Sequence, residues 1–237
     1  MDSAEDGMWW YRAIHARIGD ALRRSPAARG GRVLDAGCGT GGGLRALAAA
    51  LPGAALVGLE YDTEAAARAA RKSGMPVTGG DLNHLPFADG SFDAALSVDV
   101  LCHRGVTEAA ALAELHRVLA AGGTLVLNLP AFEWLRSAHD TRVHNARRYT
   151  APGAARLLRE AGFASVEARY WNSLLLPLMA VQRKLLNAHE DAASDVAPFP
   201  PWLDATLFAV DAAERRLAAL GLRFPAGGSV LAVATRP

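Results

Sequence analysis

The sequence predicts an α/β fold with a doubly wound parallel sheet, and three observations support this. Short apolar segments alternate with segments in which apolar residues recur every three or four positions, so strands alternate with helices. An apolar strand end at 33–36 runs into the glycine-dense turn 37–41 and then into an alanine-rich helix, as in nucleotide-binding βαβ units. A chain of 237 residues, 51% of them hydrophobic, can bury one sizeable core.

The first half of the chain supplies most of the predicted strands. From Trp9 to Arg24 apolar residues recur every four positions, which indicates an amphipathic helix that packs on the domain surface. Further elements are then expected in the order strand 32–35, helix 44–51, strand 55–60, helix 63–72, strand 76–78 and strand 92–97. Pro52-Gly53 and Gly74 end the two later helices.

The second half departs from this simple alternation. Thr107 can cap a helix through Leu119 that stops at Gly122-Gly123, ahead of a strand at 124–129. A helix capped by Thr150 and two strands follow, with the ranges 150–160, 165–171 and 229–234. The segment between these two strands is too long for a plain loop, so it predicts a helical insertion.

Acidic residues at two strand ends indicate what the glycine turn binds. Glu60 closes the second strand, where a carboxylate can accept hydrogen bonds from both ribose hydroxyls of a nucleotide. Asp81 follows the third strand and could accept the exocyclic amine of an adenine. A glycine turn alone is ambiguous because any β-to-α connection can use glycine, and Glu60 alone could be a solvated surface acid. Together they favour a nucleotide-type cofactor.

At this point the chain resembles the class I S-adenosylmethionine-dependent methyltransferases, in particular the small-molecule, type 11 branch related to the ubiquinone and menaquinone biosynthesis enzymes. The resemblance covers residues 30–130 in the family's order and spacing. Its matching segments are Val33 to Gly41, Gly58-Leu59-Glu60, Gly80-Asp81, Leu85 to Asp93, and Arg117-Val118-Leu119 with Gly122-Gly123. Ala121 departs from the family, which usually has proline there, at a position away from the cofactor.

The resemblance implies a seven-stranded Rossmann-like sheet with an antiparallel last strand, and S-adenosylmethionine as the cofactor, with S-adenosylhomocysteine as its product. It implies contacts to the methionine part from Asp35, Gly37, Cys38 and Gly39, to the ribose from Glu60, to the adenine or ribose from Tyr61, to the adenine from Asp81 and Leu82, and to the sulfonium end from Ser97. The expected organisation is a single domain over 1–237, divided into an N-terminal helical cap (1–28), a cofactor-binding core (29–129), a substrate lid (130–150) and the helical insertion (172–226).

Histidines near the lid are the candidate catalytic bases. His139 or His144, with Asp140 to orient the imidazole, could take a proton from the acceptor, and His103 after the fourth strand is a second candidate. Alternatively these side chains only tie the segment together by hydrogen bonds, or His139, Asp140 and His144 hold a metal. Two histidines and one carboxylate on a loop are weak metal evidence, so no metal is expected.

Arginines in the same segment suggest the acceptor's charge. Arg147 and Arg148 offer planar forks that suit a carboxylate or phosphate, and Tyr149 adjoins them, so an anionic acceptor is expected. One of the two arginines could instead pair with a neighbouring acid. Trp9, Trp10 and Tyr11 could cover the cofactor as an aromatic flap or pack in the core. Cys38 and Cys102 are expected to fill small packing spaces.

The predicted function is methyl transfer from S-adenosylmethionine to a small or lipid-linked, anionic metabolite, with O-methylation favoured. Two alternatives remain open. One is a non-catalytic cofactor-binding partner protein that acts through its helical insertion. The other is a dinucleotide-dependent oxidoreductase that uses the same glycine turn and Glu60, although the Gly80-Asp81 pattern disfavours it.

Composition limits the partners and the location. The net charge of +1 without a polybasic segment gives no signal for nucleic acid. Two cysteines and an acidic start at 1–6 favour the cytoplasm over secretion. The longest apolar run, 174–181, is too short to be a transmembrane segment. Within 171–186 it could touch a membrane peripherally, pack on the core, or contact a second copy in a homodimer.

Overall fold

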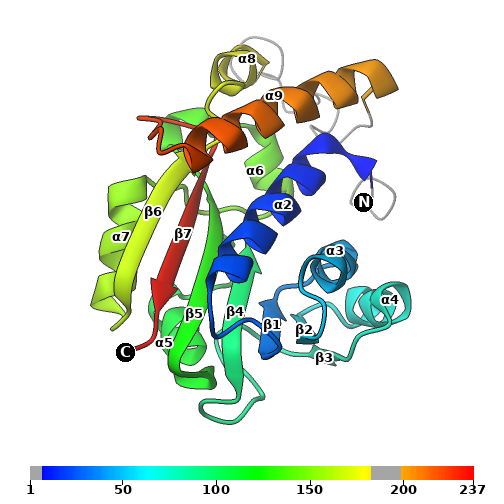
Figure 1. Cartoon of the computed structure of the whole chain (residues 1–237), viewed down its shortest axis with the longest axis vertical. Helices are drawn as coiled ribbons and strands as arrows, with labels where there is room; N and C mark the ends of the chain where they lie inside the picture. Colours follow the sequence, from blue (N-terminus) through cyan, green and yellow to red (C-terminus); the bar gives the residue numbers. More distant parts are fainter. Residues whose placement is uncertain (1–6, 183–198) are drawn as a thin grey trace.

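A computed structural model describes residues 7–182 and 199–237 and contains one seven-stranded sheet (Figure 1). The strands are β1 (Arg32–Ala36), β2 (Ala55–Glu60), β3 (Val77–Gly79), β4 (Phe92–Val98), β5 (Leu119–Pro130), β6 (Ala164–Trp171) and β7 (Ser229–Thr235). Their order across the sheet is β3-β2-β1-β4-β5-β7-β6. Strand β7 pairs antiparallel with both β5 and β6, whereas the pairings among β1 to β5 are parallel. The predicted fold class, with its antiparallel last strand, is confirmed.

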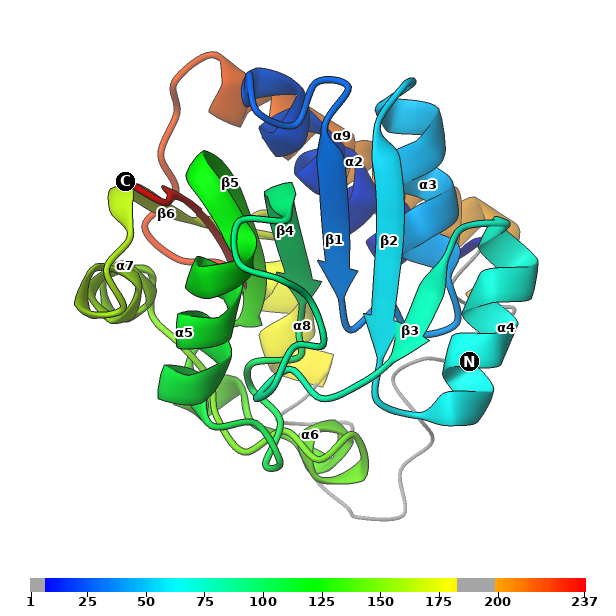
Figure 2. The same ribbon diagram turned by 90° about the horizontal axis from the view of Figure 1, so that it is seen from below.

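Helices cover both faces of the sheet (Figure 2). The described helices are α2 (Trp9–Arg24), α3 (Gly42–Ala50), α4 (Thr63–Ser73), α5 (Glu108–Val118), the 3-10 turn η1 (Glu133–Leu135), α6 (Ala138–Arg142), α7 (Ala151–Glu160), α8 (Leu176–Val181) and α9 (Pro201–Ala219). Buried residues of α5 and α7 form one core cluster, and those of α2, α3 and α9 form the other. In the described residues, no helix is long and apolar enough to cross a membrane.

Local signals place most element boundaries correctly. The Thr150 side chain accepts a hydrogen bond from the Gly153 backbone nitrogen at 3.1 Å, so it caps α7 as predicted. Helix α4 ends at Gly74, whose φ of 70° is left-handed and therefore suits glycine. Strand β2 has the predicted bounds.

The junction between α5 and β5 differs from the prediction. The helix ends at Val118 and the strand begins at Leu119, ahead of the glycine pair rather than after it. Leu119 pairs with Phe92 of β4, while the backbone of Gly122-Gly123 exchanges hydrogen bonds with Arg236 beyond β7. These glycines therefore lie inside an irregular strand. Thr107 precedes α5, but its side chain makes no capping bond.

The N-terminal helix and the insertion are joined through a buried ion cluster. Arg17 of α2 donates to Asp211 at 2.5 Å and to Glu214 at 3.3 Å, both on α9. The three side chains are 7%, 2% and 2% exposed. The guanidinium carbon also lies 4.5 Å from the ring centre of Trp171, at the end of β6. The insertion is thus packed onto the first helix, and its residues 183–198 lie outside the described part.

Candidate active site

The glycine turn after β1 has a backbone that only glycine adopts easily. Gly37, Gly39 and Gly41 have φ values of 98°, 56° and 91°. The Gly37 nitrogen donates to the Leu59 carbonyl at 2.8 Å, which holds the turn beside the end of β2. A Cβ atom added to Gly37 would lie 2.2 Å from Cγ2 of Val100, in the loop after β4. The turn is therefore a tight cradle between two strand ends.

Glu60 directs its carboxylate at this turn. Oε2 accepts from the Gly39 nitrogen at 2.9 Å, and Oε1 accepts from the Asp62 nitrogen at 3.1 Å. The adjoining Tyr61 side chain is 79% exposed. A carboxylate held beside a glycine-rich turn suits a nucleoside whose ribose offers two hydroxyl donors. The residues present therefore fit the cofactor that the sequence implies.

His15 of α2 lies close to the start of α3, directly after the glycine turn, which sequence reasoning did not predict. Asp35, at the end of β1, is 3% exposed. A Cβ atom on Gly43 would lie 3.2 Å from Oδ2 of Asp35 and 3.4 Å from Nε2 of His15, so His15 reaches the first turn of α3. The ring of Tyr11 is 6.3 Å from that of His15. The only sequence signal for His15 was its place on the amphipathic helix, one turn after Tyr11.

The three residues of the predicted aromatic flap differ in burial. Trp9 is buried in the core. Trp10 is only partly buried, with its ring centre 5.1 Å from that of Tyr11 and 6.1 Å from that of Trp171. Trp10 and Tyr11 thus form an aromatic edge between the glycine turn and the end of β6. Their contact with a cofactor stays a prediction.

The predicted adenine residues are organised by Asn83, which sequence reasoning missed. Oδ1 of Asp81 accepts from the backbone nitrogen and from Nδ2 of Asn83, both at 2.9 Å. Nδ2 also donates to the Gly105 carbonyl at 3.0 Å, and Oδ1 of Asn83 accepts from the Thr107 nitrogen at 2.8 Å. Leu82 is buried. Asn83 therefore fixes Asp81 against the loop that leads to α5.

Three small side chains of the predicted site and its surroundings, Ser97, Cys38 and Cys102, are buried. The Ser97 hydroxyl donates to the Ala36 carbonyl at 2.7 Å and ties β4 to β1. A contact of Ser97 with the sulfonium stays a prediction. Cys38 packs closely against Gly58, whose added Cβ atom would lie 2.8 Å from the sulfur. Burial raises the pKa of the Cys102 thiol far above its usual range, and the charge of Asp99 raises it further. Cys102 is thus no thiolate nucleophile.

Arg148 has an acidic partner, which is the alternative left open for one of the two arginines. Its Nε and Nη2 donate to Oδ1 and Oδ2 of Asp140 at 3.0 and 2.9 Å, and the two side chains are 2% and 0% exposed. Nη1 donates to the Ala131 carbonyl at 2.8 Å. Asp140 also accepts from the Ser137 nitrogen at 2.9 Å. This geometry supports a structural role for Arg148 and Asp140, not direct contact with an acceptor.

Arg147 and Tyr149 also fasten the segment to the rest of the domain. The Arg147 guanidinium donates to the carbonyls of Leu101, His103 and Val106 at 3.0, 3.1 and 2.6 Å. The Tyr149 hydroxyl donates to the Leu101 carbonyl at 3.2 Å, and burial raises the pKa of this phenol well above its usual range. The predicted lid is therefore held as a fixed wall beside the loop after β4.

His103 and His144 come together where this wall meets the β4 loop. His103 forms a β-bridge with Asn145, and the Arg104 nitrogen donates to the His144 carbonyl at 3.0 Å. Burial lowers the pKa of His103 below its usual 6.5, and the charge of His144 lowers it further, whereas Glu60 acts in the opposite direction. The structure thus groups two predicted bases near the predicted ribose carboxylate.

The third predicted base and the metal alternative stay open. The side chain of His139 lies outside what the structure describes, although the backbone of this residue belongs to α6. Within the described residues, no three histidine, cysteine, aspartate or glutamate side chains are grouped as metal ligands would be.

A polar chain at the ends of β4, β5 and β6 also escaped sequence reasoning. Asp99 follows β4 with a φ of 52°, an uncommon value for a residue other than glycine. Asn128 of β5 donates from Nδ2 to Oδ1 of Asp99 at 2.9 Å and accepts from Nε1 of Trp171 at 2.8 Å. All three residues lie at the carboxyl edge of the sheet, where ligands bind in such folds.

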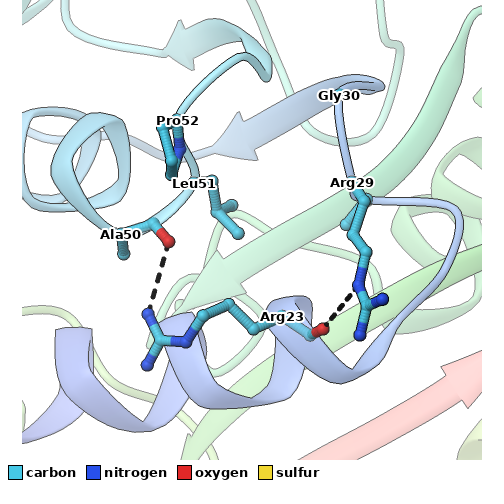
Figure 3. A pocket seen from close by; sticks show the side chains of 7 residues that line it. Arg23, Arg29, Gly30, Ala50, Leu51 and Pro52 are labelled. Atoms are coloured by element: carbon cyan, nitrogen blue, oxygen red, sulfur yellow. Dashed lines mark hydrogen bonds between the residues drawn. The ribbon is translucent and has the colours of Figure 1, made fainter.

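A cavity of about 370 Å³ lies elsewhere (Figure 3). Its lining residues are Arg23, Ala28, Arg29, Gly30, Ala50, Leu51 and Pro52. Both guanidinium groups donate to backbone carbonyls, Arg23 to Ala50 at 3.3 Å and Arg29 to Arg23 at 3.1 Å. Gly30 precedes β1 and Pro52 precedes β2, so this cavity opens at the amino ends of the strands, away from the glycine turn.

Comparison with known proteins finds similarity to methyltransferases. The family model described as "Methyltransferase domain" matches residues 34–127. A 24-methylenesterol C-methyltransferase 2 from Oryza sativa subsp. japonica is 33% identical over 174 residues, which cover 64% of this chain and 46% of the relative. A fatty-acid O-methyltransferase from Mycolicibacterium smegmatis is 31% identical over 172 residues, 71% of this chain and 56% of the relative. The chain thus spans about half the length of these relatives.

Solved structures share the fold. A geranyl diphosphate C-methyltransferase from Streptomyces coelicolor A3(2), in complex with Mg²⁺, geranyl diphosphate and S-adenosyl-L-homocysteine, has a TM-score of 0.63 at 15% identity and covers 96% of this chain and 82% of its own. A Haloferax volcanii complex of the Trm112 methyltransferase activator with a methyltransferase gives 0.62 at 22%, with coverage of 100% and 93%. At these identities the likeness concerns the fold.

Proposed function

We propose that this chain, which carries a class I S-adenosylmethionine-dependent methyltransferase domain, transfers a methyl group from S-adenosylmethionine to a small or lipid-linked acceptor. One observation carries the proposal: Glu60 accepts a hydrogen bond from Gly39 at 2.9 Å, which sets a carboxylate beside the glycine-rich turn. Carboxylate and turn lie at the carboxyl ends of adjacent parallel strands, where a nucleoside binds in such sheets.

The residues at this edge divide the binding among them. Glu60 would accept hydrogen bonds from the ribose hydroxyls, and Asp81, fixed by Asn83, would accept the adenine amine. Asp35 would bind the positively charged amino group of the methionine part. Bound S-adenosylmethionine supplies a methyl group already activated by its sulfonium, so the protein mainly aligns the acceptor and removes its proton.

For the acceptor we favour a lipid-like hydroxyl compound and O-methylation. His103 stands beside the β4 loop and is held neutral near pH 7 by its lowered pKa, so its imidazole can accept a proton. Relatives named for sterol and fatty-acid methylation support a lipid-like acceptor. Because Arg148 is paired with Asp140 and Arg147 binds three carbonyls, an acceptor anion would need another partner.

Two measurements test the proposal. Calorimetric titration should give binding of S-adenosylhomocysteine and none of NAD, and the reverse would favour an oxidoreductase. Radiolabelled methyl transfer should then be followed across a panel of fatty acids, prenyl diphosphates, sterols and amines. Tight cofactor binding without turnover of any acceptor would favour a non-catalytic partner protein.

Replacing Glu60 with glutamine is expected to weaken S-adenosylhomocysteine binding about 10–150-fold. The change keeps the shape of the side chain but removes its charge, and hydrogen bonds to charged groups contribute about 1.5–3 kcal/mol. Calorimetric titration measures the loss. Glu64→Gln is the matched control, because Glu64 lies on the next helix with its side chain 83% exposed, and it should leave the affinity unchanged. Equal affinities for the Glu60 variant and the wild type would remove Glu60 from the site.

The methyl-transfer rate is expected to fall as the pH drops through the lowered pKa of His103, below 6.5. A base must be neutral to accept a proton, so activity is retained above that pKa and lost under it. His144→Gln should move this limb to higher pH, because the charge of His144 helps to lower the pKa of His103. The control is His116→Gln, which should leave the pH profile unchanged. His116 lies on α5, where its ring packs against Phe163. A pH profile unchanged in His103→Gln would exclude this base.

A further inference from the structure

Two polar atoms just beyond the end of β6 are buried without a hydrogen-bond partner in the part of the chain that the structure describes. They are the amide oxygen Oδ1 of Asn172 and the hydroxyl oxygen Oγ of Ser173. Asn172 as a whole is 4% exposed. An unpaired buried polar atom has lost its hydrogen bonds to water without compensation, which is uncommon in folded proteins and calls for a reason. The two atoms belong to neighbouring residues, so one reason can account for both.

The backbone of Asn172 is fixed in an uncommon conformation. Its φ of 57° is left-handed, a region that residues other than glycine seldom adopt. Its backbone oxygen accepts from the Gly228 nitrogen at 3.1 Å, and the preceding residue, Trp171, donates from Nε1 to Asn128 at the carboxyl edge of the sheet. Such conformations cluster at ligand sites, where the surrounding contacts impose them. Asn172 is therefore held firmly at the edge that carries the candidate active site.

The side chains of Asn172, Ser173 and Met179 meet over the glycine pair that precedes β7. A Cβ atom added to Gly228 would lie 3.2 Å from Nδ2 of Asn172 and 2.2 Å from Cε of Met179. A Cβ atom added to Gly227 would lie 2.8 Å from Oγ of Ser173. The two glycines thus form a floor without side chains, on which the thioether of Met179 lies beside the amide of Asn172. We term these five residues the Asn172 recess.

Met179, which belongs to α8, covers the recess with a side chain that is able to move. Methionine is unbranched and has three rotatable side-chain bonds, so it adapts readily to its surroundings. None of the residues of α8 is buried, so a shift of this helix would expose little additional apolar surface. The start of the helix is fixed, however, because Oε2 of Glu214 accepts from the backbone nitrogens of Ser173 and Leu174 at 2.6 and 2.9 Å. The cover can therefore move while the unpaired atoms stay in place.

The chemistry of the recess fits an uncharged hydroxyl group on an apolar body. Oδ1 of Asn172 only accepts hydrogen bonds, so its partner must donate one, which a hydroxyl does and an ionised carboxylate does not. The five residues of the recess carry no charge, so a charged group would be buried among them without an opposite charge. All six residues of α8 are apolar, which suits an aliphatic chain beside the hydroxyl.

We propose that the Asn172 recess is an acceptor subsite, in which a hydroxyl group of a lipid-like alcohol displaces the Met179 side chain and donates to Oδ1 of Asn172. Oγ of Ser173 makes a second hydrogen bond to the same hydroxyl. The recess adjoins Trp171, whose polar chain reaches Asp99 after β4, and α8 lies beyond the end of the sheet at which α6 is found (Figure 1). The identity of the ligand as the acceptor rests on the proposed methyl transfer, whereas the preference for a neutral donor does not.

Binding of simple alcohols tests the recess without the natural acceptor. Octan-1-ol is the probe, and methyl octyl ether is the matched compound that has no hydrogen to donate. In titrations followed by tryptophan fluorescence, the wild type should bind octan-1-ol about tenfold more tightly than the ether, because only the alcohol satisfies the buried acceptor. Octanoate and octylammonium should also bind more weakly than octan-1-ol, because each would bury a charge.

The double variant N172G/S173A should lose this preference and bind the alcohol and the ether about equally. Glycine suits a φ of 57°, and the change deletes an unpaired buried group, so the variant should fold and bind S-adenosylhomocysteine like the wild type. The matched control is Ser165→Gly, which has a φ of 48° at the opposite end of β6 and should keep the preference. Met179→Ala should bind octan-1-ol with a faster association rate, because no long side chain has to move first.

Several results would overturn the subsite: equal wild-type affinities for octan-1-ol and the ether, a preference that survives in N172G/S173A, or a wild type that binds neither probe. An unchanged association rate in Met179→Ala would refute the role of Met179 as the cover. A wild type that prefers the alcohol but fails to bind S-adenosylhomocysteine would keep the recess and refute the proposed methyl transfer alone. Binding of S-adenosylhomocysteine without the alcohol preference would refute the recess alone.

Discussion

Replacing Arg17 with methionine is expected to lower the free energy of unfolding by about 3–5 kcal/mol, because removing one partner of a buried ion pair leaves an uncompensated charge. Asp211 and Glu214 would both stay buried, at 2% exposure each, without their shared cation. Burial already raises the pKa of Asp211 against the opposing effect of Arg17. Methionine fills much of the space, so the loss would reflect charge more than a cavity. Urea unfolding followed by circular dichroism measures the difference.

The matched control is Arg12→Met on the same helix. Arg12 also pairs with an α9 carboxylate, Asp204, and also lies over an aromatic ring, that of Phe208 at 4.2 Å, but its side chain is 39% exposed. Partly exposed ion pairs contribute about 0–1 kcal/mol, so this variant should stay close to the wild type. Similar losses in the two variants would show that burial of the Arg17 cluster does not set its energy.

Replacing Gly37 with alanine is expected to abolish measurable S-adenosylhomocysteine binding and to destabilise the domain by about 2–5 kcal/mol. A left-handed backbone costs an alanine roughly 1–2 kcal/mol, and overpacking adds about 1–3 kcal/mol. Both apply here, because the φ of Gly37 is 98° and the new methyl group would lie 2.2 Å from Cγ2 of Val100. Calorimetric titration and thermal unfolding measure the two effects.

Two further variants separate these causes. Gly53 has a φ of 88° with nothing within 4 Å of an added Cβ atom, so Gly53→Ala carries the backbone cost alone and should bind the ligand normally. Val100→Ala removes the clashing methyl group, so the double variant Gly37→Ala/Val100→Ala should recover part of the stability. If Gly37→Ala bound ligand like the wild type, the turn would not be the cofactor cradle.

Much of the fold could be predicted because its signals are local. Strand β2 and the Thr150 cap depend on a few neighbouring residues, and both were placed correctly. The predicted boundary between α5 and β5 was wrong, because the real one depends on Phe92 and Arg236. These residues are distant in sequence and pair with this part of the chain only in the folded sheet. Glycine pairs end many helices, so the local signal was misleading there.

The candidate site divides in the same way. Glu60 beside the glycine turn could be predicted, since both follow directly from the ends of adjacent strands. The pairing of Arg148 with Asp140 could not be predicted, because the sequence was equally compatible with an acceptor anion and with a neighbouring acid as the partner of Arg148. His15 and Asn83 gave no chemical signal of their own, and only their positions beside Gly43 and Asp81 reveal them.

The sequence by itself determined the sheet and the glycine turn, because backbone conformation and strand order depend on residue type and local spacing, and it predicted the place of the methyl donor. Only the tertiary structure decided which charges are paired and which surface stays apolar. Arg17 meets Asp211 across nearly the whole chain, and Leu178 is exposed while Met179 is covered. Such outcomes depend on which distant elements pack together, and burial then sets the energy of each charge and each apolar side chain.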